Sequence, residues 1–400
     1  MPNIAKRILP TIVFSQFACT SVWFAVNAIM PEILATHNLS PAFLGYLTSS
    51  VQFGFIVGTL TFAVLTLADR FSPSKVFMVC AVAAALFNLV VTWESGAAAV
   101  LLLSRFCVGF FLAGIYPVGM KIAADYFKDG LGKSLGFLVG ALVLGTAFPH
   151  FLKANAAHFS WHYIAYGTAA LSLLGGLLIG LTVSDGPYRQ KGSAVKLGAF
   201  LEVFKNQGFR RAAFGYFGHM WELYTFWAFV PVMLSAYNAL HASSHISVPL
   251  YSFLIIAIGT PACIIGGLLS QKYDTQRIAA ICLMLSGLCC LLFPFVFLYD
   301  NQVLLLGFLF FWGMVVIADS PLFSSLVANN AEPKLKGTGL TLVNSAGFAI
   351  TIASIQLMMW LLQEFESPFT YAILAMGPVF GLMGLRNKLK NKLQPTTPDA

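Results

Sequence analysis

The sequence predicts an all-α membrane protein of twelve transmembrane helices, arranged as two pseudo-symmetric six-helix bundles. The composition sets the class: 58% of the 400 residues are apolar and only 10% are charged, whereas soluble domains carry about 25% charged residues. A soluble fold of this size could not bury so much apolar surface. The composition therefore excludes an ordinary soluble enzyme, a disordered chain and a disulfide-built protein.

Twelve apolar runs are each near the roughly 20 residues that a helix needs to cross a bilayer. In chain order they cover residues 9–32, 42–67, 75–93, 98–121, 133–153, 161–184, 212–237, 248–270, 278–299, 302–328, 337–362 and 367–385. The basic residues before the first run are also typical of a signal peptide, but this run is too long for one. We therefore expect it to be the first membrane helix.

The basic residues predict the orientation. With both termini on one side of the membrane, 21 of the 23 Lys and Arg residues fall in segments on that side. Basic residues gather in cytoplasmic loops. We therefore expect an integral membrane protein with both termini in the cytoplasm, in a bacterial inner membrane. The net charge of +8 is explained by this orientation and does not indicate a nucleic-acid partner.

The chain divides into two halves of six spans. We expect an N-terminal bundle (1–184), a cytoplasmic central loop (185–211) and a C-terminal bundle with a short basic tail (212–400). Segments 67–75 and 269–277 align at an offset of 202 residues, and Ser21-Val-Trp23 aligns with Thr225-Phe-Trp227 at an offset of 204. Similar offsets and equal span counts indicate duplication, as in transporters built from parallel repeats.

Two short motifs point to a family. Asp69 and Arg70 occupy the charged positions of a Gly-x-x-x-Asp-Arg-x-Gly-Arg signature between the second and third spans, although both of its glycines are replaced. Arg105 and Gly109 match an arginine and a glycine four residues apart in the fourth span. Over its whole length the chain resembles the major facilitator superfamily, and residues 105–136 are similar to its organic-anion and nitrate/nitrite-like branches.

This resemblance implies where substrate and gate residues lie. Spans 1, 4, 7 and 10 would line a central cavity, so the candidate substrate-binding residues are Trp23, Asn27, Arg105, Tyr116, Trp221, Tyr224 and Trp312. Each aromatic or amide residue among them has simple packing as its alternative. The resemblance also implies a cytoplasmic gate, for which the candidates are Asp69, Arg70, Lys75, Lys272 and Arg277. Their alternative is a role in topology and loop capping.

Charged residues inside the spans are the strongest functional candidates, since each costs at least about 2.5–3.5 kcal/mol at the centre of a membrane helix. Glu222 follows Arg211 by eleven residues, which is about 16 Å along a helix and near the membrane midplane. His219 shares its helix face. We expect Glu222 to exchange the coupling proton with His219 as its neighbour. The alternative is a carboxyl group that only links helices.

Two further buried charges have open roles. Asp319 precedes Ser320-Pro321, and proline removes a backbone donor. Asp319 is therefore either part of a kinked cation or proton site, or the cap of the helix that resumes after it. Arg105 keeps its charge in any environment. It either clamps an anion and serves proton coupling, or makes fixed hydrogen bonds to the carbonyl groups of a neighbouring helix.

These observations together predict a secondary active transporter and not an enzyme. We expect proton-coupled uptake of a small organic anion or zwitterion by alternating access; the alternative is a proton-driven efflux antiporter of an amphipathic compound. Sodium remains open as the coupling ion. We expect a monomer surrounded by lipid, with no cofactor, no nucleic-acid partner and no metal site, because the seven cysteines lie in apolar runs without zinc spacing.

Overall fold

The structure is a computed structural model that describes residues 2–94, 96–127, 131–155, 159–189, 200–332 and 335–385, and these residues form helices without strands. Eleven segments in this part of the chain are long and apolar enough to cross a membrane. The first predicted span is not among these eleven and is broken into the three helices α1 (Pro2–Thr20), α2 (Ala25–Ala28) and α3 (Met30–Thr36). The predicted all-α membrane fold is therefore confirmed.

The helices follow the predicted spans in order. Those of the N-terminal half are α1 (Pro2–Thr20), α2 (Ala25–Ala28), α3 (Met30–Thr36), α4 (Phe43–Val64), α5 (Leu67–Arg70), α6 (Pro73–Leu89), η1 (Val90–Thr92), α7 (Ala98–Leu112), α8 (Tyr116–Tyr126), α9 (Leu131–Asn155) and α10 (His162–Thr182). Those that follow are α11 (Phe200–Val203), α12 (Gln207–Leu240), α13 (Val248–Ala257), α14 (Gly259–Leu269), α15 (Thr275–Leu298), α16 (Gln302–Ala318), α17 (Ser320–Asn330), α18 (Lys336–Phe365), η3 (Pro368–Ala375) and α19 (Met376–Leu385).

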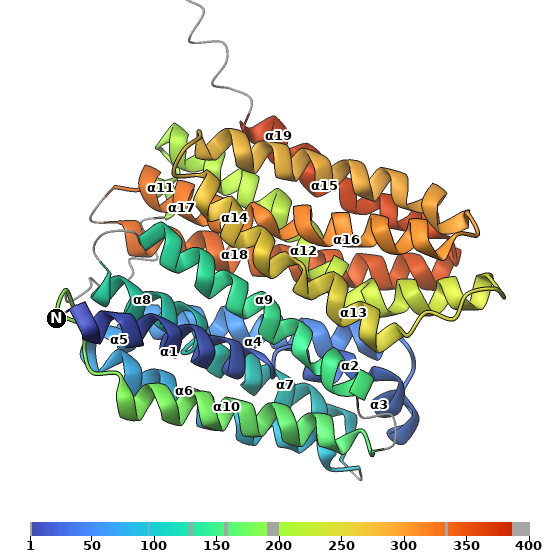
Figure 1. Ribbon diagram of the computed structural model, residues 1–400, viewed down its shortest axis with the longest axis horizontal. Helices are drawn as coiled ribbons and strands as arrows, with labels where there is room; N and C mark the ends of the chain where they lie inside the picture. The colour runs from blue at the N-terminus through green and yellow to red at the C-terminus, as the bar shows by residue number, and fades with distance from the viewer. Residues whose placement is uncertain are drawn as a thin grey trace, which may run out of the picture.

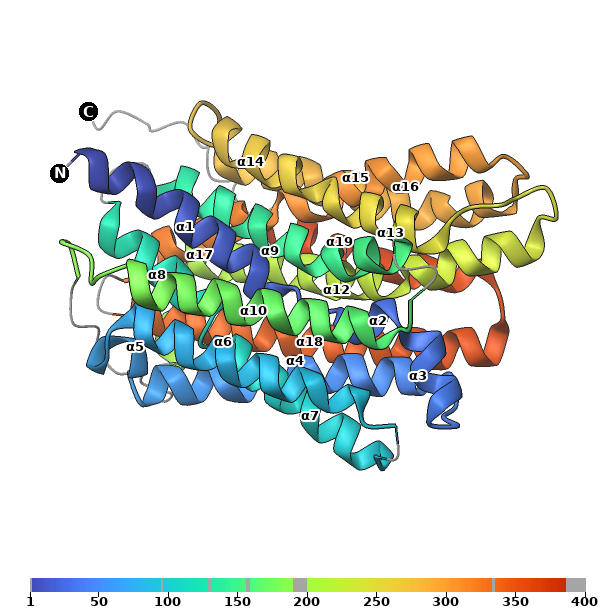
Figure 2. The same ribbon diagram turned by 60° about the horizontal axis from the view of Figure 1, so that its bottom comes forward.

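Figures 1 and 2 show the two halves as bundles side by side, blue to green for the N-terminal half and yellow to red for the C-terminal half. They meet along two seams: α4 packs against α18, and α9 packs against α13 and α14. We call the end of the molecule that carries the N-terminus the basic end. The other end carries α3 and the start of α13, and we call it the far end.

The fourth and tenth spans break at corresponding places. The starts of α8 (Tyr116–Tyr126) and α17 (Ser320–Asn330) are 204 residues apart, and each helix has proline at its second position. Proline lacks the N–H that would continue the preceding helix. The tertiary structure therefore repeats the offset that the sequence motifs indicate.

Helix α12 differs from the predicted span at its start. It begins at Gln207, five residues before the predicted position, because the Asn206 side chain accepts a hydrogen bond from the Phe209 N–H at 3.1 Å. An asparagine in this capping position satisfies a helix donor that would otherwise lack a partner. Residues 190–199 of the predicted central loop lie outside the described residues.

Candidate functional site

Four aromatic side chains join the two halves near the middle of the molecule. Trp23, which lies between α1 and α2, has its ring centre 5.8 Å from those of Tyr224 and Phe348. Phe55 and Phe348 lie 4.4 Å apart. We call these four residues the aromatic cluster. All four are buried, so the two halves are in direct contact here.

A small cavity lies next to the aromatic cluster and is lined from both halves. Its lining residues are Tyr116, Val139, Leu142, Tyr216, Met220, Leu223, Tyr224, Ile317, Ser320, Asn344 and Phe348. Its volume is about 20 Å³, which is room for about one water molecule. No Lys, Arg, Asp or Glu is among these lining residues. The Tyr216 hydroxyl donates to Asn344 Oδ1 at 2.8 Å across this wall.

A histidine–aspartate pair lies directly behind residues that line this central cavity. His219 Nδ1 lies 2.8 Å from Asp319 Oδ1, and both side chains are about 1% exposed. Asp319 joins α16 to α17 and directly precedes Ser320, which lines the cavity. The His219 ring lies 6.0 Å from that of Tyr216, another lining residue. The Asp319 side chain makes no capping hydrogen bond to α17, so the capping alternative has no contact to support it.

The same pair retains unused polar atoms. Asp319 Oδ2 and His219 Nε2 are buried, and neither has a hydrogen-bond partner among the described residues. Burying an unpartnered polar atom costs free energy, so a proton or a bound ligand at these atoms would be stabilised. The sequence predicts Glu222 as the neighbour of His219, whereas in the structure the His219 ring pairs with Asp319, the residue before α17. Two residues on the same face of a helix can still point their side chains toward different neighbouring helices.

Glu222 is enclosed within the C-terminal half. Its Oε1 accepts from Trp312 Nε1 at 2.6 Å and from the Cys290 thiol at 3.3 Å, and its Oε2 accepts from the Ser286 hydroxyl at 2.9 Å. These donors lie on α15 and α16. Glu222 thus links three helices of one bundle, and Trp312, expected in the cavity wall, is its partner instead.

Arg105 makes three hydrogen bonds inside the N-terminal half. One terminal nitrogen donates to the carbonyl oxygens of Val22 and Trp23, at 2.9 and 2.7 Å, and the other donates to Asn88 Oδ1 at 3.1 Å. The break between α1 and α2 frees these carbonyl groups from helical bonding, and a buried donor must satisfy them. Arg105 thus makes the fixed hydrogen bonds to backbone carbonyl groups that are the alternative to an anion clamp. These bonds also position Trp23 in the aromatic cluster.

The other candidate substrate residues separate into two groups. Tyr116 and Tyr224 line the central cavity. Asn27 donates to Thr48 Oγ1 at 3.0 Å, and Trp221 donates to the Ile373 carbonyl at 3.3 Å, so both are engaged within their own halves. Four further lining residues with polar or aromatic side chains are not among the predicted binding residues, namely Tyr216, Ser320, Asn344 and Phe348. Tyr216 lies three residues before His219 and Ser320 directly follows Asp319, and this closeness to a buried titratable residue is the signal that would have found them.

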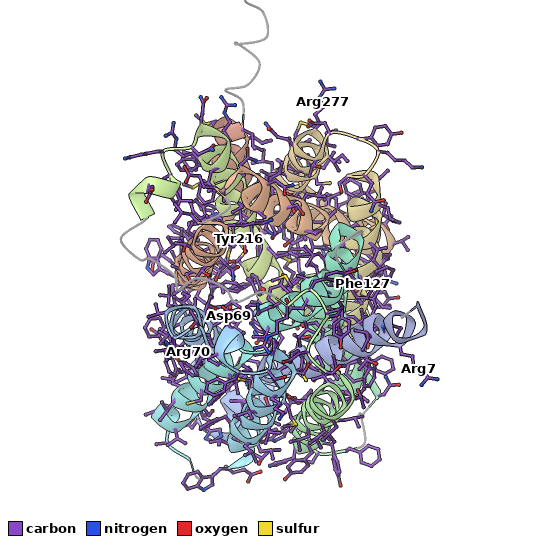
Figure 3. All side chains as sticks on the ribbon, turned by 90° about the vertical axis from the view of Figure 1, so that its left-hand side faces the viewer. Arg7, Asp69, Arg70, Phe127, Tyr216 and Arg277 are labelled. Carbon is purple, nitrogen blue, oxygen red and sulfur yellow. The ribbon has the colours of Figure 1, made fainter. Side chains whose placement is uncertain are left out.

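The gate candidates at the basic end do not pair across the halves. Asp69 Oδ1 lies 2.7 Å from Lys121 Nζ on α8, within the N-terminal half. Arg70, Lys75, Lys272 and Arg277 are exposed, and no described ion pair includes them. Figure 3 shows Asp69 and Arg70 near the boundary of the halves and Arg277 at the outer edge of the C-terminal half. Among the described residues, the Asp69–Lys121 ion pair is therefore internal to one bundle, and the gate role of these candidates stays a prediction.

Comparison with known proteins identifies the fold and the family. The family model described as Major Facilitator Superfamily matches residues 12–355. The crystal structure of the human organic anion transporter MFSD10 (TETRAN) superposes with a TM-score of 0.74 at 15% sequence identity, covering 96% of this chain and 99% of that chain. No curated protein sequence matches the chain. A likeness at this identity establishes the shared fold.

Proposed function

The chain belongs to the major facilitator superfamily of membrane transporters, and we propose that it carries a small organic anion or zwitterion into the cytoplasm together with a proton. The superfamily is one of transporters and not of enzymes, and the apolar helices embed the chain in a membrane. The proposal adds the coupling ion, the substrate class and the direction. It rests on one observation, the His219–Asp319 pair beside a cavity without fixed charge.

The pair couples a proton to a substrate carboxylate by charge balance. With a neutral imidazole and an ionised carboxylate, the pair has a net charge of −1, and uptake of one proton makes it neutral. A carboxylate that enters the uncharged cavity beside it is repelled in the first state and accepted in the second, because charges interact strongly in a poorly solvated interior. Proton and substrate therefore favour each other's binding, and this linkage is reciprocal.

The cavity lining supplies neutral hydrogen-bond donors for such a substrate. Tyr116, Tyr224 and Ser320 carry hydroxyl groups and Asn344 carries an amide NH₂, and all of these can donate to a carboxylate. The Tyr216 hydroxyl already donates to Asn344 Oδ1. The rings offer flat apolar surface to the body of the substrate. The space of about 20 Å³ admits no metabolite, so the halves must separate to admit one, as alternating access requires. Separation at the aromatic cluster would open the cavity toward the far end.

Glu222 is the second candidate for the coupling group. Its three donors are an indole, a hydroxyl and a thiol, and none of these residues lines the central cavity. Both Glu222 oxygens also accept from protein donors, whereas His219 Nε2 and Asp319 Oδ2 have no hydrogen-bond partner among the described residues. We therefore assign coupling to His219 and Asp319, and assign Glu222 the task of holding α12, α15 and α16 together.

One alternative has an observation in its favour. The aromatic cluster and the uncharged lining would also suit an amphipathic compound expelled in exchange for protons. In that case substrate and proton would compete for the pair, so substrate binding would release a proton. Under the symport proposal substrate binding takes up a proton, and the sign of this proton exchange separates the two functions.

The test uses purified protein in liposomes. A thermal-stability screen of small carboxylates and zwitterions identifies a ligand, since a ligand that binds the folded state raises its apparent stability. With that ligand, an imposed inward proton gradient should drive accumulation by the wild type. Asp319→Asn, which keeps the shape but fixes the charge, should abolish accumulation and retain counterflow, and Glu222→Gln should keep both. Full accumulation by Asp319→Asn contradicts the assignment of the pair.

A further inference from the structure

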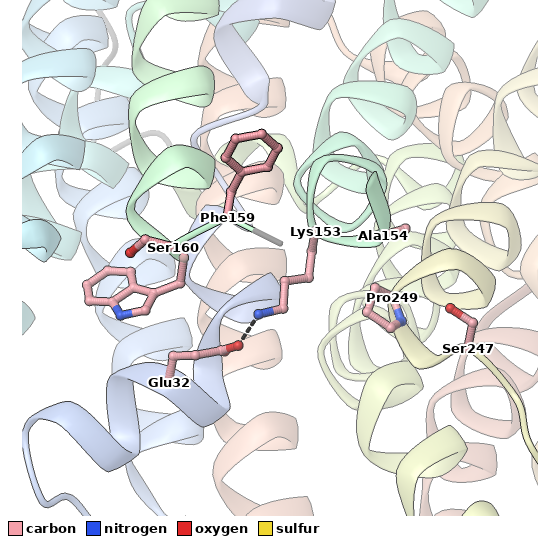
Figure 4. A pocket seen from close by; sticks show the side chains of 8 residues that line it. Glu32, Lys153, Ala154, Phe159, Ser160, Ser247 and Pro249 are labelled. Carbon is pink, nitrogen blue, oxygen red and sulfur yellow. Dashed lines mark hydrogen bonds and ion pairs between the residues drawn. The ribbon is translucent and has the colours of Figure 1, made fainter. Parts of the chain in front are cut away.

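A second and larger cavity opens at the far end of the molecule, where the two halves meet. Its volume is about 560 Å³, within the range of small-molecule sites. The N-terminal half supplies Glu32 from α3, Lys153 from α9, and Phe159 and Trp161 from the segment before α10, while Ser247 comes from the C-terminal half. Figure 4 shows Lys153 and Glu32 reaching toward each other across this pocket. We call it the far-end pocket.

The far-end pocket contains one charge of each sign. Lys153 Nζ forms an ion pair with Glu32 Oε1. Side chains of both residues are partly exposed, at 25% and 30%. Glu32 Oε2 is buried and has no hydrogen-bond partner among the described residues. The ammonium group has three donors and the carboxylate has this free acceptor, so both can bind an additional group.

This pairing is selective for a ligand that carries both charges. A zwitterion can place its carboxylate on Lys153 and its ammonium on Glu32, and each of the two partly exposed charges keeps a partner. A monoanion or a monocation would separate the pair and leave one charge uncompensated, which is costly away from water. The rings of Phe159 and Trp161 lie in the same wall and would cover an apolar ligand body.

We propose that the far-end pocket binds a small zwitterion, an amino carboxylate with an apolar body, at the outer entrance of the transport path. The inference rests on the proposed function for its place on that path, and it narrows the substrate class from anion or zwitterion to zwitterion. The central cavity is compatible with this choice, because its hydroxyl and amide groups can bind the carboxylate of a zwitterion, which is the group that the proposed coupling step senses.

The test compares three probes of one shape. L-Phenylalanine is a zwitterion, N-acetyl-L-phenylalanine keeps only the carboxylate, and L-phenylalaninamide keeps only the ammonium. Titration calorimetry of the purified full chain should give saturable binding of phenylalanine, at least tenfold tighter than either derivative. Lys153→Gln and Glu32→Gln should each weaken phenylalanine binding at least tenfold. Glu364→Gln, which removes an exposed carboxylate on the last turn of α18, is the matched control and should change nothing.

The two variants should also change the order of preference, which misfolding would not do. Lys153→Gln leaves Glu32, so the amide should bind as well as phenylalanine. Glu32→Gln leaves Lys153, so the N-acetyl derivative should bind this variant as well as phenylalanine does. Ser247→Cys locates the site directly: phenylalanine should slow its labelling by a membrane-impermeant maleimide, in a chain whose described native cysteines are buried or half-buried.

Each contrary outcome overturns the inference. These outcomes are absence of saturable phenylalanine binding to the wild type, equal binding of all three probes, an unchanged order of preference in both variants, or labelling of Ser247→Cys that phenylalanine does not slow. The proposed function fails by a separate measurement, which is full gradient-driven accumulation by Asp319→Asn. That variant lies outside the far-end pocket and should keep the wild-type preference among the three probes.

Discussion

The two halves each contain one buried charged residue that joins their first, third and fourth spans. In the N-terminal half, Arg105 of the fourth span binds carbonyls at the end of the first and Asn88 of the third. In the C-terminal half, Glu222 of the first span binds Ser286 of the third and Trp312 of the fourth. The same three helices are joined by opposite charges placed on different helices.

This comparison shows that the duplicated scaffold needs a polar link at this place, while its chemistry is free to differ. The guanidinium group stays charged and binds backbone, so it fixes the broken first span. The carboxyl group of Glu222 binds side chains. The second carboxylate near mid-span, Asp319, also lies in the C-terminal half, beside the central cavity. We infer that the N-terminal half holds the fixed charge and the C-terminal half carries the proton chemistry.

The largest effect should come from removing the N-terminal link. Arg105→Met leaves the carbonyls of Val22 and Trp23 buried without donors and should destabilise the fold by about 3 kcal/mol, since each unsatisfied group costs about 1–3 kcal/mol. Thermal unfolding of the purified protein measures this loss. Arg105→Lys, which keeps the charge and some donors, should lose less. Equal stability of Arg105→Met and wild type would contradict the clamp.

The next effect tests whether the halves are packed alike. Gly109 and Gly313 are 204 residues apart, and a Cβ at either would overlap a carbonyl oxygen of the adjacent span, that of Val51 or of Ile255. Alanine at either position should therefore destabilise the fold by about 1–3 kcal/mol, to a similar extent in both halves. Gly307→Ala is the control, because nothing lies within 4 Å of its Cβ; it should be neutral or slightly stabilising. A large difference in stability between Gly109→Ala and Gly313→Ala would contradict the similar packing of the two halves.

Removing the acceptor of the C-terminal link should have a smaller effect. Glu222→Gln keeps the shape but replaces one acceptor oxygen with an amide donor, so either Trp312 or Ser286 loses its partner. We expect a loss of about 1–2 kcal/mol of stability, measured by thermal unfolding, while gradient-driven accumulation continues. If accumulation stops and counterflow persists, Glu222 takes part in coupling, and the division of roles between Glu222 and Asp319 is wrong.

The smallest effect concerns the basic end. Asp69 pairs with Lys121 of its own half at 2.7 Å, and partly exposed ion pairs contribute only about 0–1 kcal/mol. Asp69→Asn should therefore change stability by less than about 1 kcal/mol and leave cysteine accessibility at both ends of the transport path as in the wild type. A shift in accessibility toward the basic end would restore the gate role that the sequence motif implied.

Much of the arrangement could be predicted from residues alone. The twelve apolar runs, the buried charges Arg105, Glu222 and Asp319, and the proline after Asp319 are all visible in the sequence. The partner of His219 could not be predicted in this way. Glu222 lies near it on the same long helix, whereas the actual partner, Asp319, is one hundred residues away in the chain. Which face of a helix meets which neighbour depends on the packing of all the others.

The break in the first span shows the limit most clearly. Residues 21–24, Ser-Val-Trp-Phe, contain neither proline nor glycine, so no local signal ends α1 at Thr20. The break is stabilised by Arg105, which reaches it from another span. The sequence by itself determined the membrane class and indicated the spans and their duplication, because hydrophobicity and charge act locally on each segment. Tertiary structure alone decided which buried polar groups met, because in an apolar interior every such group must find a partner, and that partner comes from a distant segment.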